Sequence, residues 1–252
     1  MYKYLQILQK KRFFNKQDVI GITGNVRTAE SVLATYQKKG VICRVRRDLY
    51  CAANVATGLP DVSKYEVASA INDDSSVAYH AALEFYGLNH QLWNEVRVIT
   101  STPFRTFYFD GATFKAQLSN QKAGIVEPIW GGGIKVTSLE RTVIDCIANS
   151  DRAGGYEEVM HCFEALTALY ETKLIEMLEV YNKPIIWKKV GCVLEMINDQ
   201  IELSSSFFET CLKNIDSSVN YLTNPRECKQ YVSKWKLYIP KTDSYPYIDE
   251  LI

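Results

Sequence analysis

The chain has 252 residues, 47% of them hydrophobic and 12% aromatic, and its 29 lysines and arginines balance 29 aspartates and glutamates. This length exceeds one modest domain and suits two, with a core large enough to fold unaided. No run of about 18 apolar residues occurs, so we expect no transmembrane helix. The N-terminus has no small-residue cleavage site after its short apolar stretch, so we also expect no signal peptide.

Seven cysteines form an odd set without a C-x-x-C pair. Several lie inside apolar runs such as TVIDCIA and VGCVL. We therefore predict reduced, buried thiols in a cytoplasm, and neither a disulfide framework nor a zinc site.

Positive charge is concentrated at the start of the chain. Residues 1–50 contain eleven lysines and arginines and three acids, a net charge of +8, so residues 51–252 carry −8. A basic head on an acidic body implies an anionic partner for the head, nucleic acid before a membrane surface. We predict a nucleic acid and no membrane partner.

The first 55 residues have the pattern of three short helices followed by a hairpin. The helices are predicted over residues 2–11, 16–22 and 28–39, and the strands over residues 41–45 and 49–52. Asn15 and Thr28 are expected as helix N-caps, and Gly40 ends the third helix. This order is typical of a winged helix-turn-helix, which lays its third helix in the major groove and rests its wing on the backbone. We predict such a domain over residues 1–55.

Residues 56–252 are predicted to form a second, larger domain after a linker at 55–64. Helices are expected over 64–71, 75–88 and 138–149, and strands over 94–102, 105–111, 112–118 and 123–130. The pattern is mostly helical from Gly155 to about residue 215, and the aromatic tail from Asn224 is expected to pack irregularly. The fold class is therefore α+β, a winged helix-turn-helix followed by a mixed α/β domain with a helical C-terminal part.

Nine side chains of the head are candidate DNA contacts. Short polar and basic residues on the third helix suit base edges and phosphates, and basic residues on the wing suit phosphates. If about 5 charges reach phosphates, the logarithm of the binding constant falls with log salt at a slope of about −4 to −5. The alternative is a solvated or protein-binding surface. The candidates are Lys16, Arg27, Thr28, Ser31, Thr35, Lys38, Arg44, Arg46 and Arg47.

The sequence contains only weak indications of a catalytic or metal site. The triple glycine at 131–133 lacks the G-K-[ST] of a phosphate loop and indicates a turn between strands. His80 lies in the apolar run AYHAAL and is expected as a core or interface histidine. His161 and Glu164 share a helix face, but no second pair completes a metal site. Asp73-Asp74 indicates a charged helix start. We expect no catalytic residue, no metal and no cofactor.

The segment SLERTVIDCIAN contains a predicted helix start at Ser138. Arg141 and Asp145 stand four residues apart and can pair across one helical turn. An exposed pair of this kind contributes only about 0.2–0.5 kcal/mol, so we expect it to orient the helix more than to stabilise it.

Three stretches together resemble the AbiEi-type antitoxins of bacterial type IV toxin–antitoxin (abortive infection) systems. They are NKQDVIGITG with VICRVRRDLY, YEVASAI with SSVAYHAALEFYGL, and KVTSLERTVIDCIAN, and they span most of residues 1–150. The chain departs from the family pattern at Asp48, where the family usually has glycine. Aspartate tolerates left-handed backbone less well than glycine but better than most residues, so the wing should survive.

The resemblance implies a winged-helix autorepressor that binds inverted repeats in the double-stranded promoter of its own operon. It also implies that the C-terminal domain neutralises a nucleotidyltransferase-like toxin, directly or indirectly, without enzymatic activity. DNA recognition then falls on helix 28–39 and on Arg44, Arg46 and Arg47. Two alternatives remain open: a stand-alone transcription regulator with a ligand-sensing or dimerisation domain, and an enzyme that its N-terminal module positions on DNA.

Overall fold

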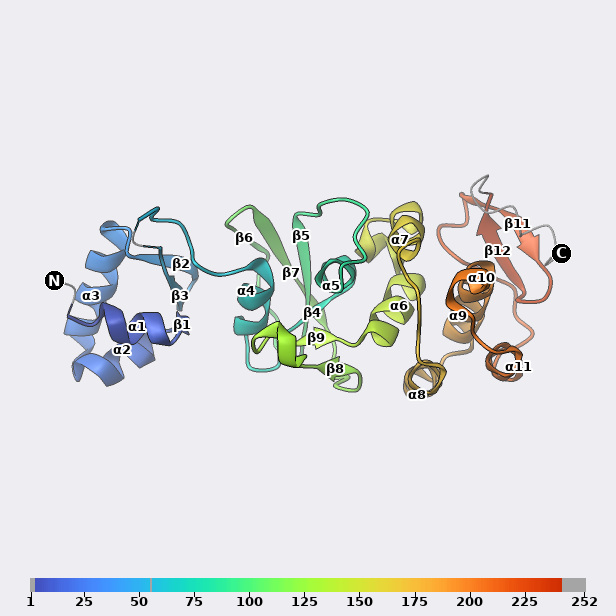
Figure 1. The fold of residues 1–252 in the computed structure, drawn as a ribbon, viewed down its shortest axis with the longest axis horizontal. Helices are drawn as coiled ribbons and strands as arrows, with labels where there is room; N and C mark the ends of the chain where they lie inside the picture. Colours follow the sequence, from blue (N-terminus) through green and yellow to red (C-terminus); the bar gives the residue numbers. More distant parts are fainter. Residues whose placement is uncertain (1–2, 55, 242–252) are drawn as a thin grey trace. The chain divides into compact units, whose positions relative to one another are not determined.

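The computed structural model describes residues 3–54 and 56–241 and combines helices with several small sheets, so the expected mixture of α and β structure is confirmed. The chain divides into two compact units. The first contains Met1–Val77, Asn94–Asn120 and Pro128–Lys135, and the second contains Ala78–Trp93, Gln121–Glu127 and Val136–Ile252. Figure 1 gives the element labels used below.

Residues 3–54, here called the N-terminal module, form three helices and one antiparallel sheet (Figure 1). The helices are α1 (Leu5–Lys10), α2 (Lys16–Thr23) and α3 (Val26–Lys38), and the strands are β1 (Phe13–Phe14), β2 (Ile42–Arg46) and β3 (Leu49–Ala52) in the order β1-β3-β2. Their common core contains Leu8, Phe14, Val19, Ala29, Leu33, Tyr36 and Ile42, all nearly excluded from solvent.

Local capping sets the ends of α2 and α3. Asn15 and Asp18 form a reciprocal capping box at the start of α2, so the expected N-cap at Asn15 is confirmed. Gly24 ends α2 with φ 73°, a left-handed conformation that glycine adopts without steric cost. The expected N-cap of α3 at Thr28 is wrong, because Asn25 caps that helix and accepts a hydrogen bond from the backbone N–H of Thr28 at 3.1 Å.

The rest of the first unit contains α4 (Lys64–Ala70) and three strands of a larger, six-stranded sheet. Ser63 and Glu66 form a capping box at the start of α4. Strand β7 (Ala112–Leu118) pairs in parallel with β5 (Glu95–Thr100) and antiparallel with β6 (Phe107–Phe109).

The expected helix at 75–88 is only partly present. Its first part is the strand β4 (Ser76–Ala78), and the helix α5 begins later, at His80–Phe85. Asp74 does not start a helix but accepts hydrogen bonds from the Thr100 hydroxyl at 2.8 Å and the Ser101 N–H at 2.6 Å. These bonds, with those of Ser101 first, lower the pKa of Asp74 to about 2.

The second unit is mainly helical, as expected for residues 155–215. Its helices beside α5 are α6 (Leu139–Ala148), α7 (Tyr156–Phe163), α8 (Glu171–Tyr181), α9 (Pro184–Met196), α10 (Asn198–Ile201) and α11 (Ser205–Lys213), with a 3-10 turn at Ser150–Ala153. Helix α6 contacts α5, α7, α8 and α9 and buries eight of its ten residues. The strands β8 (Ile125–Val126) and β9 (Val136–Thr137) pair antiparallel. The strand expected at 123–130 is therefore short, and Ile129–Gly131 is a 3-10 turn.

Arg141 and Asp145 of α6 do pair, with 3.5 Å between Arg141 Nε and an Asp145 carboxylate oxygen. Both side chains are buried, unlike the exposed pair considered from the sequence. Arg141 also donates to the carbonyl of Ala123 at 2.5 Å, and Asp145 accepts from the Tyr181 hydroxyl. Burial raises the pKa of Asp145 despite these neighbours. Ser138 caps α6, as expected.

The tail is regular up to residue 240, so the irregular packing expected from Asn224 onward is wrong there. Strand β12 (Leu237–Pro240) pairs with β10 (Asn220–Tyr221) and β11 (Cys228–Val232). Trp235 is fully buried against Gly191 of α9, where any Cβ would collide with the indole ring, and its Nε1 donates to Glu195 at 2.7 Å. This anchor fixes the sheet on α9. Tyr245, Pro246 and Tyr247 lie outside the described residues.

All seven cysteines are free; six of them are buried, as expected, and Cys43 is partly exposed. Within residues 3–54 and 56–241, no helix has both the length and the apolar character needed to cross a membrane.

Candidate nucleic-acid interface

One side of α3 is exposed and carries basic and small polar residues. With 3.6 residues per turn, spacings of four and seven place Arg27, Ser31 and Lys38 on the side opposite the buried stripe. Thr28 and Thr35 flank them and are exposed as well. All five candidate contacts predicted on this helix therefore face solvent.

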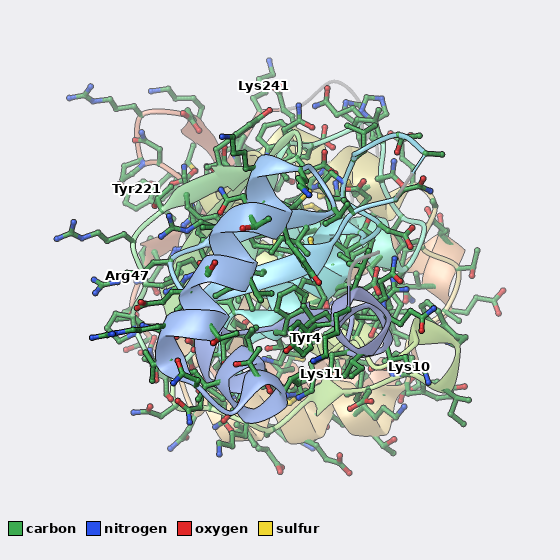
Figure 2. The ribbon with its side chains drawn as sticks, turned by 90° about the vertical axis from the view of Figure 1, so that its left-hand side faces the viewer. Tyr4, Lys10, Lys11, Arg47, Tyr221 and Lys241 are labelled. Carbon is green, nitrogen blue, oxygen red and sulfur yellow. The ribbon has the colours of Figure 1, made fainter. Side chains whose placement is uncertain are left out.

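Two further exposed arginines lie at and near the turn between β2 and β3: Arg44 within β2, and Arg47 in the turn itself. Arg44 Nε donates to the carbonyl of Arg46 at 3.3 Å, which holds its guanidinium along the turn. Figure 2 shows the Arg47 side chain extending outward on the side of α3, whereas Lys10 and Lys11 lie on the other side of the view, beside α1. Arg47 and the pair Lys10 and Lys11 thus lie on different sides of the module in this view.

Asp48 shapes this turn. Its φ is 58°, so it adopts the left-handed backbone expected for a position that is usually glycine in the resembled family. Its carboxylate accepts a hydrogen bond at 2.9 Å from the backbone N–H of Lys16, the first residue of α2. A negative charge is favourable at a helix N-terminus. Asp48 therefore holds the turn against α2, which a glycine could not do.

Lys16 connects the turn with α3. Its backbone N–H binds Asp48, and its ammonium group lies 2.6 Å from Glu30 of α3. Lys16 therefore contacts the turn through Asp48 and the first half of α3 through Glu30. The Lys16 charge is used in this ion pair, so we do not count it among the charges available to a ligand.

Two other cations of the N-terminal module are also paired. Lys11 lies 2.5 Å from Asp18, and Arg12 forms an ion pair with Glu66. Partial burial acts to raise the pKa of Asp18, but hydrogen bonds from Lys11 and from the Asn15 N–H outweigh it and lower the pKa. The module therefore presents fewer available charges than its sequence suggests.

Arg46 occupies a different environment from its neighbours. Its guanidinium carbon lies 5.4 Å from the ring centre of Phe104 and 5.8 Å from that of Phe107, both in the first unit beyond the N-terminal module. A cation over aromatic rings at this separation is attracted by their electron-rich faces. Arg27, Lys38, Arg44 and Arg47 are thus each exposed, whereas Arg46 is half-buried beside the aromatic rings. We call those four residues, with Ser31, the α3–turn surface.

The sequence analysis does not predict the contact of Arg46 with its aromatic partners. The run RTFYF predicts a strand, and β6 forms there, but nothing in its spacing indicates an arginine from residue 46 as a neighbour. The available indication was that two phenylalanines, Phe104 and Phe107, lie close together at the exposed start of β6.

No known family model matches the chain, and no curated protein sequence matches it. Among solved structures, the crystal structure of the RV2827C protein from Mycobacterium tuberculosis is similar, with a TM-score of 0.63. The two are 12% identical, and the match covers 94% of this chain and 90% of that one. At this identity the likeness shows a shared fold alone.

Proposed function

We propose that this protein binds double-stranded promoter DNA through the N-terminal module and represses its own operon. The observation that carries the proposal is the α3–turn surface. Among the described residues, none of its four cations is engaged in an ion pair, although three neighbouring cations are. These four charges are therefore available to an anionic ligand.

The proposed complex uses the module as a winged helix-turn-helix. A helix with side chains is about 10–12 Å wide and the major groove about 12 Å, so α3 can enter with its exposed side toward the bases. Arg27 and Ser31 then face base edges or phosphates, and Arg44 of β2 and Arg47 of the turn reach the adjacent backbone. The buried stripe of α3 keeps the helix fixed on the module during binding.

The pairing pattern refines the expected salt dependence. With about 4 available charges rather than 5, the slope of log binding constant against log salt is about −3.6. Promoter binding should weaken steeply with salt but less steeply than a count of all basic residues predicts.

The antitoxin part of the proposal rests on the sequence resemblance. The remainder of the chain carries a net charge of −8, which suits a basic partner surface. In this proposal the partner is a nucleotidyltransferase-like toxin encoded beside this gene, and neutralisation is direct or indirect. A stand-alone regulator would need no such partner.

Arg27→Ala with Arg47→Ala in the full-length chain tests the proposal. We expect weaker binding to the promoter fragment upstream of the gene and a salt slope smaller by about 2, measured by fluorescence anisotropy across a salt series. The same variant should still rescue cells that express the neighbouring toxin, because the two roles use different parts of the chain.

Lys10→Ala is the matched control, since it removes an exposed charge beside α1 and should leave the slope within measurement error. Equal affinities of the double variant and the unmodified protein would refute the DNA interface. Loss of toxin rescue in a folded double variant would refute the division of roles.

A further inference from the structure

Three side chains that can bind metal converge in the second unit, away from the α3–turn surface. They are His80 of α5 and Glu158 and Cys162 of α7. His80 Nε2 lies 2.8 Å from a Glu158 carboxylate oxygen, and Cys162 Sγ lies 3.5 Å from that oxygen and 3.8 Å from His80 Nε2. All three side chains are almost completely buried.

Local structure positions these donors. Glu158 and Cys162 are four residues apart and therefore share one face of α7. Gly154, with φ 94°, precedes this helix, and a Cβ there would lie 2.9 Å from Glu158 Cγ. Tyr79, directly before His80, has φ 56°, a strained conformation for a bulky residue. Two unusual backbone positions thus hold α5 and α7 in the arrangement that brings the donors together.

The surroundings orient the carboxylate. Gln91 Nε2 donates to the second Glu158 oxygen at 2.7 Å, and His90 Nδ1 lies 3.5 Å from the same oxygen. Hydrogen bonds from His80, Gln91 and Cys162 hold the Glu158 carboxyl group in place. His90 is half exposed, so the cluster borders a side chain that solvent reaches.

The ring nitrogen of His80 that faces the other two donors is Nε2. His80 Nδ1, the other ring nitrogen, is buried and has no hydrogen-bond partner within the described chain. The ligand atoms of His80, Glu158 and Cys162 all lie within 4.8 Å of one another, so the three side chains can share one ion.

We propose that His80, Glu158 and Cys162 bind a divalent transition-metal ion of the zinc class. Zinc binds histidine nitrogen and carboxylate oxygen at about 2.0–2.2 Å and sulfur at about 2.3 Å, and tetrahedral angles then separate the ligand atoms by about 3.3–3.6 Å. The observed separations of 2.8, 3.5 and 3.8 Å bracket this range, so small side-chain rotations suffice.

The charges of the site also suit this ion. A thiolate and a carboxylate neutralise a dication, so the loaded site adds no net charge to the interior. The Cys162 thiol proton leaves to solvent when the sulfur binds the metal. Water or the His90 imidazole completes the fourth position. The loaded ion would join α5 to α7 within the second unit.

Titration of the metal-free, full-length protein with Co²⁺ tests the site, because tetrahedral cobalt with a thiolate ligand gives a sulfur-to-metal charge-transfer band and intense visible bands. We expect one Co²⁺ per chain, displaced by Zn²⁺, and no charge-transfer band in Cys162→Ser. Cys211→Ser, which alters another buried thiol in α11, is the matched control and should bind as the unmodified protein does. Gln91→Ala should weaken binding by about 10–100-fold, since it removes an outer hydrogen bond to a ligand.

X-ray absorption at the zinc edge of the unmodified protein gives a second measurement that needs no variant. One sulfur at about 2.3 Å with nitrogen or oxygen neighbours is the expected shell. An absence of stoichiometric binding, a shell without sulfur or with several sulfurs, or an unchanged cobalt spectrum in folded Cys162→Ser would each overturn the proposal.

Discussion

The α3–turn surface and the His80–Glu158–Cys162 cluster place reactive groups in opposite environments. The first is exposed, and its members lie within residues 27–47 on one small module. The second is buried, and its members on α7 lie 78 and 82 residues after His80 in the chain. A ligand of the surface is bound from solvent by long, mobile side chains, whereas a ligand of the cluster is enclosed by the packing of two helices.

Because of this contrast, a substitution can change ligand binding without changing stability on the α3–turn surface, but not in the buried cluster. An exposed cation can be removed at little cost to folding, since surface substitutions usually change stability by less than about 0.5 kcal/mol. A residue that shapes the buried cluster cannot be changed without altering the packing of α5 and α7. The two regions should therefore respond differently to comparable substitutions.

The largest expected effect is that of Gly154→Ala. The new Cβ would meet Glu158 Cγ at 2.9 Å, and alanine is strained at φ 94°. Overpacking typically costs about 1–3 kcal/mol, and the positive φ costs about another 1 kcal/mol. We expect a loss of about 2–4 kcal/mol in the free energy of unfolding, measured by urea denaturation.

Gly87→Ala is the matched control in the same unit. Gly87 has φ 78°, but a Cβ added there would meet no atom within 4 Å, so only the backbone cost of about 1 kcal/mol applies. Equal losses in the two variants would show that the approach of Gly154 to Glu158 does not constrain the cluster.

A smaller effect is expected at Asp48, where the exposed surface meets the fold. Asp48→Ala removes the hydrogen bond to the Lys16 N–H and places alanine at φ 58°. Loss of a helix-capping acceptor costs about 0.5–2 kcal/mol. We expect a loss of about 1–2 kcal/mol by urea denaturation and a less well-held turn, seen as weaker promoter binding.

Asp48→Asn and Asp48→Gly separate the two causes. Asparagine keeps an acceptor and tolerates the left-handed backbone, and glycine keeps only the backbone freedom. The order of stability should be Asp, Asn, Gly, Ala. A glycine variant as stable as the unmodified protein would mean that the Asp48–Lys16 contact contributes nothing.

The sequence predicts the N-terminal elements well because their boundaries depend on neighbours. Asn15 with Asp18 caps α2 and Gly24 ends it, all within ten residues. The exposed side of α3 follows from periodicity alone, since its buried and polar positions repeat every three or four residues. Thr28 has the chemistry of a cap, but Asn25 occupies that position three residues earlier.

The features missed from the sequence depend on distant partners. Ser76–Ala78 is too short and too apolar to be distinguished from a helix by its pattern. Its strand conformation depends on a hydrogen bond from Val77 to the carbonyl of Lys135, far along the chain. The contact of His80 with α7 likewise depends on residues that are distant in the sequence. Spacing rules find metal ligands when they are close in sequence, and here only the Glu158–Cys162 pair is.

The smallest effect, and the sharpest test of the surface, separates the adjacent Arg46 and Arg47. Arg46→Ala removes the contact with Phe104 and Phe107 and should cost about 0.5–1 kcal/mol of stability, while the salt slope of promoter binding stays unchanged. Arg47→Ala should leave stability within about 0.5 kcal/mol and reduce the slope by about 1. Arg46→Lys is a useful control, because lysine keeps the charge but loses the planar group that lies over the rings. If the two alanine variants exchange these behaviours, Arg46 leaves the aromatic rings in the complex, and the α3–turn surface must include it. Denaturation and anisotropy on the same preparations decide between these outcomes.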